Sequence, residues 1–124
     1  MAQSVRVAVV EDDALVRSAL SRLLSAVGFE VSQHASAEEF LLRLDRARPT
    51  CVLADVHLPR LSGLELETVL NELGCHLPFV FITGDRDVAA SDSVRQAGVT
   101  CLLKPVEDAV LLTAVIKASG SAPA

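Results

Sequence analysis

The sequence has few cysteines and no Cys-x-x-Cys pair, which argues against a redox site or a zinc site. Its three cysteines, Cys51, Cys75 and Cys101, lie far apart in the chain. Cys51 and Cys101 stand in apolar runs and are predicted to be buried free thiols. Free thiols of this kind fit a reducing, cytoplasmic setting.

Long hydrophobic runs and clusters of basic residues are also missing. No stretch approaches the length of a membrane span, so we expect no membrane association. The apolar run at residues 7–10 is too short for a signal peptide, and three acids end it at residues 11–13. The 11 Lys and Arg residues are scattered and the formal net charge is −5, which argues against nucleic-acid binding by this domain.

Five apolar runs alternate with five helical patterns along the 124 residues, a length that suits one domain with one core. Short apolar or β-branched runs predict strands at residues 5–10, 30–34, 51–54, 78–82 and 99–103. Helical spacing, caps and glycine stops predict helices at 14–27, from Ser36 past Leu44, at 64–73, from Asp85 or Asp87 to Ala97, and at 107–118.

This alternation predicts an α/β fold of the (βα)5 type, doubly wound, with parallel strands, right-handed crossovers and helices on both faces of the sheet. In the first helix, Arg17 and Arg22 are expected to turn away from the core. The helix that ends at Ala97 is rich in Ala and Ser, so we expect it to be the least firmly packed. Residues 1–118 would form the domain, and residues 119–124 a flexible tail or the start of a linker.

Polar residues stand where four of the predicted strands end. Glu11 and Asp12 follow the first strand, Asp55 ends the third, Thr83 ends the fourth and Lys104 ends the fifth. In sheets of this class the carboxyl ends of the strands meet at one edge, where ligands bind. We therefore expect these side chains to converge there.

The predicted cluster has the chemistry of a phosphoryl-transfer site. The carboxylates of Glu11, Asp12 and Asp55 repel one another unless a proton or a cation intervenes. Oxygen ligands without nearby His or Cys favour Mg²⁺. The ammonium of Lys104 and the hydroxyl of Thr83 suit the oxygens of a phosphoryl group, which Asp55 would accept as an acyl phosphate.

An ordered set of motifs resembles the receiver domain of two-component response regulators. The set comprises Glu11–Asp12, Asp55 with Pro59 and Gly63 after it, Thr83–Gly84 and Lys104–Pro105, and the resemblance spans residues 5–117. The segments VVEDDALVRSAL and FITGDRD are most similar to FixJ-type receivers, which usually precede a LuxR-type DNA-binding domain. The resemblance implies a flavodoxin/CheY-like fold with five parallel strands in the order 2-1-3-4-5.

The resemblance also implies a role for each residue of the metal site. Asp12, Asp55 and the backbone carbonyl of His57 would bind Mg²⁺, or Mn²⁺ in its place. Glu11 would act on the metal through water.

For the phosphoryl group, the resemblance implies that Asp55 is the acceptor, Lys104 the cation that binds it and Thr83 the switch hydroxyl. The Lys104–Pro105 peptide bond would be cis. A sensor histidine kinase would supply the phosphoryl group, and an effector domain or protein would read the result. The domain would catalyse only its own phosphorylation and dephosphorylation, and the last two repeats would form a homodimer surface.

The sequence departs from the family pattern at several positions. The acidic pair is Glu-Asp rather than the more usual Asp-Asp. Cys101 stands where the family has its switch aromatic, and no aromatic residue follows Phe81. The family's usual coupling, in which an aromatic ring turns inward, therefore cannot operate in that form. His57 and Asp85 occupy positions that set the autodephosphorylation rate in the family.

Alternative interpretations remain open at this stage. A phosphatase of the haloacid dehalogenase kind would need a second acid where His57 stands. A receiver-like interaction module without phosphorylation is the other alternative. Asp13 is expected to cap the first helix rather than bind a metal. The helix at 107–118 is apolar over more than one face, and the surplus is either extra core or a partner surface.

Overall fold

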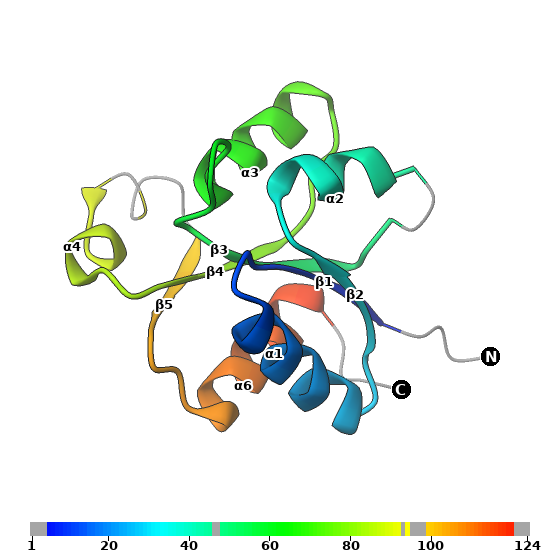
Figure 1. The fold of residues 1–124 in the computed structure, drawn as a ribbon, viewed down its shortest axis with the longest axis vertical. Helices are drawn as coiled ribbons and strands as arrows, with labels where there is room; N and C mark the ends of the chain where they lie inside the picture. Colours follow the sequence, from blue (N-terminus) through cyan, green and yellow to red (C-terminus); the bar gives the residue numbers. More distant parts are fainter. Residues whose placement is uncertain (1–4, 46–47, 93, 95–98, 121–124) are drawn as a thin grey trace.

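Five parallel strands form a single sheet in the computed structural model, which describes residues 5–45, 48–92, 94 and 99–120 (Figure 1). The strand order is β2-β1-β3-β4-β5, as predicted. The strands are β1 (Arg6–Val10), β2 (Glu30–His34), β3 (Cys51–Asp55), β4 (Phe79–Thr83) and β5 (Thr100–Leu103).

Helices cover both faces of the sheet, which confirms the doubly wound prediction. They are α1 (Ala14–Ala26), α2 (Ala37–Arg43), α3 (Gly63–Glu72), α4 (Arg86–Ala89) and α6 (Asp108–Ser119). Figure 1 shows α2 and α3 on one side of the sheet and α1 and α6 on the other. Each side has its own apolar core, one around Phe40 and Phe81 and the other around Leu24 and Leu111. Among the described residues, none of the helices combines the length and apolar composition needed to cross a bilayer.

Burial follows the position of each strand in the sheet. All residues of the central strands β3 and β4 are buried, whereas the edge strands β2 and β5 are partly exposed. Cys51, on β3, is a buried free thiol as predicted, and its burial raises the pKa of the thiol to about 12. The same prediction is wrong for Cys101, which is only half-buried because β5 lies at the sheet edge.

Short polar side chains start the helices as their sequence positions indicate. Asp13 caps α1, since its Oδ1 accepts hydrogen bonds from the N–H groups of Leu15 and Val16. Ser62 and Glu65 form a capping box at the start of α3, which was not predicted from the sequence. The helix therefore begins at Gly63, one residue earlier than expected. At the other end of the chain, α6 extends to Ser119, and the tail at 121–124 lies outside the described residues.

The predicted helix from Asp85 or Asp87 to Ala97 is not continuous, because it breaks after Ala89, and Asp92 and Val94 are helical again. Asp85 caps α4, but α4 ends at Ala89, after only 4 residues. Ser91 interrupts the helix because its hydroxyl accepts a hydrogen bond from the N–H of Val94, which is the bond that a new helix cap makes. Ala97 and the predicted stop at Gly98 lie outside the described residues. None of the residues of α4 is buried, which agrees with the expectation of weak packing.

Gly63 brings the start of α3 into close contact with the end of β3. A Cβ atom at this position would lie 2.4 Å from the carbonyl oxygen of Asp55, a separation that only a backbone shift relieves. The N–H of Gly63 also donates a hydrogen bond to the carbonyl of Val56 at 3.0 Å. The backbone at Asp55 is therefore packed against the N-terminus of α3.

We expect Gly63→Ala to lower the free energy of unfolding by about 2 kcal/mol, because the added methyl group overlaps backbone atoms. Gly84→Ala is the matched control, since a Cβ there has nothing within 4 Å. It should change the free energy by less than about 0.5 kcal/mol. Urea unfolding followed by circular dichroism measures both. Equal effects of the two substitutions would contradict the role assigned to Gly63.

Candidate functional site

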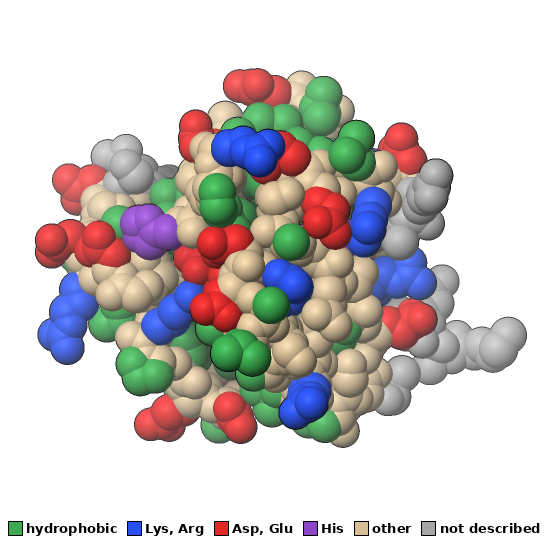
Figure 2. Space-filling view, in the orientation of Figure 1, with side chains coloured by type: hydrophobic (Ala, Val, Ile, Leu, Met, Phe, Trp, Pro, Cys, Tyr) green, Lys and Arg blue, Asp and Glu red, His purple; other side chains and the backbone are tan. Residues whose placement is uncertain are grey.

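The polar residues predicted at the strand ends lie together at the carboxyl edge of the sheet. Asp55 and Thr83 are the last residues of β3 and β4, and Glu11 and Lys104 directly follow β1 and β5. Asp12 comes next in the loop between β1 and α1. In the space-filling view, acidic side chains gather near the middle of one face with a basic side chain beside them (Figure 2).

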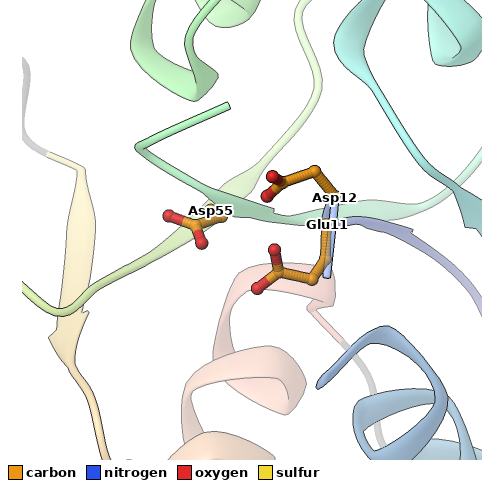
Figure 3. A group of neighbouring side chains, drawn as sticks. All are labelled: Glu11, Asp12 and Asp55. Carbon is orange, nitrogen blue, oxygen red and sulfur yellow. The ribbon is translucent and has the colours of Figure 1, made fainter. Parts of the chain in front are cut away.

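Three carboxylates form the centre of this site. Glu11, Asp12 and Asp55 each offer one oxygen atom, and these atoms all lie within 4.8 Å of one another (Figure 3). Glu11 is 1% exposed and Asp55 is 6% exposed, whereas Asp12 faces solvent. Two of the three negative charges are therefore shielded from water, which makes their mutual repulsion costly.

Lys104 bridges the two buried carboxylates. Its Nζ lies 3.0 Å from Glu11 Oε1 and 2.8 Å from Asp55 Oδ2. Partial burial lowers the pKa of Lys104, but its hydrogen bonds to Asp55 and Glu11 raise that pKa by more. The ammonium is thus held in its charged form. The contact with Glu11 was not predicted from the sequence.

Glu11 retains an unfavourable environment for its charge despite this bond. Burial raises the pKa of the Glu11 carboxyl, and the hydrogen bond from Lys104 offsets this only in part. Its second oxygen, Oε2, accepts a hydrogen bond from the N–H of Asp13 at 3.2 Å. Additional positive charge at this site would therefore stabilise the folded protein.

Arg17 reaches this region from α1, contrary to the expectation that it turns outward. Its Nη1 donates a hydrogen bond to the carbonyl oxygen of Glu11 at 2.8 Å. The sequence contains one signal for this contact, which is that Arg17 lies one helical turn after the acidic loop.

The remaining predicted residues surround Asp55 or follow β4. The N–H of His57 donates a hydrogen bond to Asp55 Oδ1 at 2.8 Å, so both oxygens of Asp55 have donors. Thr83 is fully buried, and its hydroxyl oxygen accepts a hydrogen bond from the N–H of Asp85 at 3.1 Å. The N–H of Lys104 donates to the carbonyl of Thr83 at 2.7 Å, and the Lys104–Pro105 bond is cis.

Cys101, which the resemblance places at the position of the switch aromatic, lies on β5. It pairs with Phe81 in the sheet and packs against the same apolar core. Burial raises the pKa of its thiol, and the negative charge of Asp55 raises it further. The site and Cys101 are therefore close enough to interact electrostatically.

The donor set fits a divalent cation that prefers oxygen ligands. Three carboxylates and the ammonium of Lys104 give a formal charge of −2 when all four groups are ionised. A divalent ion such as Mg²⁺ would balance this charge, with ligands from Asp12 and Asp55 beside Glu11. The role of the His57 carbonyl as a further ligand stays a prediction.

Comparison with known proteins identifies the family and the fold. The family model of the response regulator receiver domain matches residues 7–116. Nodulation protein W of Bradyrhizobium diazoefficiens is 41% identical over 112 residues, which cover 90% of this chain and 49% of that protein. The transcriptional regulatory protein FixJ of Azorhizobium caulinodans is 40% identical over 119 residues, which cover 93% of this chain and 55% of FixJ. The chain thus spans about half the length of these relatives.

Solved structures show the same fold. The crystal structure of FixJ-N has a TM-score of 0.86 and 35% sequence identity, and the match covers 99% of each chain. The chemotaxis protein CheY4 of Vibrio cholerae has a TM-score of 0.83 at 23% identity, over 94% of this chain and 99% of CheY4. At that identity, the likeness to CheY4 concerns the fold alone.

We expect Lys104→Met to lower the free energy of unfolding by about 3 kcal/mol at pH 7, because it leaves two buried carboxylates without their cation. The pKa of Glu11 is already raised above its usual 4.5, and loss of the cation raises it further. Protonation then relieves the repulsion in the folded state. The difference from the wild-type protein should therefore shrink as the pH falls from 7 toward 4.5.

Urea unfolding at several pH values measures this difference. Lys117→Met, which replaces an exposed lysine in the last turn of α6, is the control and should have little effect at any pH. A loss of stability in Lys104→Met that stays constant across this pH range would contradict the proposed charge balance.

Proposed function

The chain belongs to the family of response regulator receiver domains, and on that premise we propose that it accepts a phosphoryl group on Asp55. The observation that carries the proposal is the ion pair between Asp55 and Lys104 at the carboxyl edge of the sheet, 2.8 Å long and flanked by two further acids. A buried carboxylate with a cation and a candidate metal site beside it is suited to attack phosphorus.

The donor in this proposal is a phosphohistidine of a sensor histidine kinase. An oxygen of Asp55 forms a bond to phosphorus while the bond from phosphorus to the imidazole nitrogen breaks. The bonding electron pair returns to that nitrogen, which takes up a proton. The product is an acyl phosphate on Asp55 and a free histidine on the kinase.

Residues of this chain hold the reacting carboxylate and face the phosphoryl oxygens. The N–H of His57 and the ammonium of Lys104 fix the orientation of the Asp55 carboxylate. Lys104 lies where its charge faces a phosphoryl group on Asp55, and it would exchange a carboxylate partner for a phosphoryl oxygen. Asp12 and Asp55, with Glu11 beside them, would hold Mg²⁺ or Mn²⁺, which would supply further positive charge to the site.

Thr83 would pass the change on to α4. Its hydroxyl oxygen accepts the N–H of Asp85, so its own hydrogen is available for a phosphoryl oxygen. Asp85 in turn caps α4 by accepting the N–H groups of Asp87 and Val88. A shift of Thr83 would thus move the cap of a helix that has no buried residues. Cys101 would leave space for this shift in place of a rotating aromatic ring.

The proposed role of the whole protein follows from its relatives. Response regulators such as FixJ are named as transcriptional regulatory proteins. We place this domain in the cytoplasm, as the phosphorylated part of a regulator whose effector domain or partner acts on transcription. It would catalyse only its own phosphorylation and dephosphorylation, and it would form homodimers through its last two repeats.

Acetyl phosphate with Mg²⁺ should add one phosphoryl group that is stable in acid and labile in base, as expected of an acyl phosphate. Asp55→Asn should abolish the labelling, because the amide is a poor nucleophile. Asp45→Asn, at an exposed aspartate away from the sheet edge, should be labelled like the wild-type protein. Intact-protein mass spectrometry measures the label. If Asp55→Asn is labelled as strongly as the wild-type protein, Asp55 is not the phosphoryl acceptor.

The same preparation tests the two alternatives. A phosphatase of the haloacid dehalogenase kind would turn over a phosphate ester in saturating Mg²⁺, although His57 stands where its general acid is needed. An interaction module without phosphorylation would show the same amide exchange with and without beryllofluoride. Either result would replace the proposed function.

A further inference from the structure

Every polar group of Glu11 has a hydrogen-bond partner. Its N–H donates to the carbonyl of His34 at 3.0 Å, and its carbonyl accepts from Nη1 of Arg17 at 2.8 Å. Its carboxylate oxygens accept from Lys104 and from the N–H of Asp13. Hydrogen bonds from β2, from α1 and from the residue after β5 therefore fix the position of Glu11, which precedes Asp12.

Arg17 differs from the other partners because it is a charged side chain that binds the backbone. It lies half-buried in α1 and reaches back 6 residues to the Glu11 carbonyl. Three acids, residues 11–13, are its neighbours in the chain. Within the part of the chain that the structure describes, the ion pairs are formed by other residues, and the guanidinium bonds to a peptide oxygen instead.

We propose that Arg17 is a positioning residue for the metal site. The carbonyl that Arg17 holds belongs to the peptide that joins Glu11 to Asp12. Fixing this peptide fixes the direction in which the Asp12 side chain leaves the backbone. It keeps an Asp12 oxygen within 4.8 Å of the oxygens of Glu11 and Asp55. The inference rests on the proposed function, since it concerns the site that would bind Mg²⁺.

The charge of Arg17 and its position have opposite effects on Mg²⁺ binding. As a cation near the site, Arg17 repels Mg²⁺, so removing its charge alone would tighten binding. By holding the peptide between Glu11 and Asp12, Arg17 lowers the entropy cost of ordering Asp12 when Mg²⁺ binds. Removing the Arg17 side chain would therefore weaken binding. The guanidinium is partly exposed and its charge is screened, whereas its hydrogen bond is short and charge-assisted. Positioning is therefore the larger effect.

Isothermal titration calorimetry of the whole chain with MgCl₂ tests the proposal, and it suits a protein that has no Trp or Tyr for intrinsic fluorescence. We expect Arg17→Met to raise the Kd for Mg²⁺ by about 10-fold, the size typical of residues that orient metal ligands. Arg17→Lys keeps the charge but places it on a different hydrogen-bond donor, so its Kd should lie between those of the wild-type protein and Arg17→Met. Arg22→Met, at an exposed arginine of the same helix, should leave the Kd unchanged.

A melting curve without Mg²⁺ separates positioning from a general loss of stability. A purely structural role would lower the Tm of Arg17→Met and leave the Mg²⁺ Kd of the folded protein unchanged, which would overturn the proposal. An unchanged or lower Kd in Arg17→Met would overturn it too, as would an equal loss of affinity in Arg22→Met. If Arg17→Met does not fold, the Kd of Arg17→Lys for Mg²⁺ tests the proposal instead. A Kd equal to that of the wild-type protein would overturn the proposal.

Labelling by acetyl phosphate distinguishes failure of this inference from failure of the proposed function. Wild-type protein that binds Mg²⁺ and is labelled on Asp55, together with Arg17→Met that binds Mg²⁺ as tightly, refutes the inference alone. Wild-type protein that neither binds Mg²⁺ nor is labelled refutes the proposed function, and the inference with it.

Discussion

The ammonium of Lys104 is the interaction on which the arrangement of the site depends. Lys104 contacts Glu11 and Asp55, which lie 93 and 49 residues away in the sequence. It thereby joins the ends of β1, β3 and β5, and its backbone N–H joins the end of β4. Two carboxylates with little exposure to water are tolerated because this one cation lies between them. The same cation lies beside Asp55, the carboxylate proposed to accept the phosphoryl group.

The order of the elements and the strand-end residues could be predicted because they depend on local patterns. Apolar runs mark the strands, and glycines and caps mark most helix ends. Parallel strands then bring Asp55, Thr83 and Lys104 to one edge whatever the details of packing. The break after Ala89 could not be predicted, because Ala and Ser carry a weak pattern and the hydroxyl of Ser91 competes with the helix backbone. The half-burial of Cys101 follows from the edge position of β5, which the predicted strand order indicates but the apolar run around Cys101 does not.

The sequence indicates the contacts of Glu11 and Arg17 only weakly, through the position of Arg17 one helical turn after the acidic loop. Both side chains are long, and their partners are set by rotamers and by loop geometry rather than by spacing. Glu11 contacts Lys104 directly, at 3.0 Å. Arg17 occupies a helical position that a hydrophobic pattern assigns to solvent, yet a flexible side chain of this length can fold back to a backbone carbonyl.

The single turn of α4 also bears on the thermodynamics of signalling. None of its residues is fully buried, and Val88 packs half-buried against the apolar core, so a rearrangement confined to α4 would expose or cover a limited apolar surface. Apolar surface is the main source of heat-capacity change, so such a switch would leave almost no calorimetric trace. It would also need little energy, because few packed side chains must separate. A change of charge at Asp55, as proposed, would then shift the conformation of α4 at a small cost in free energy.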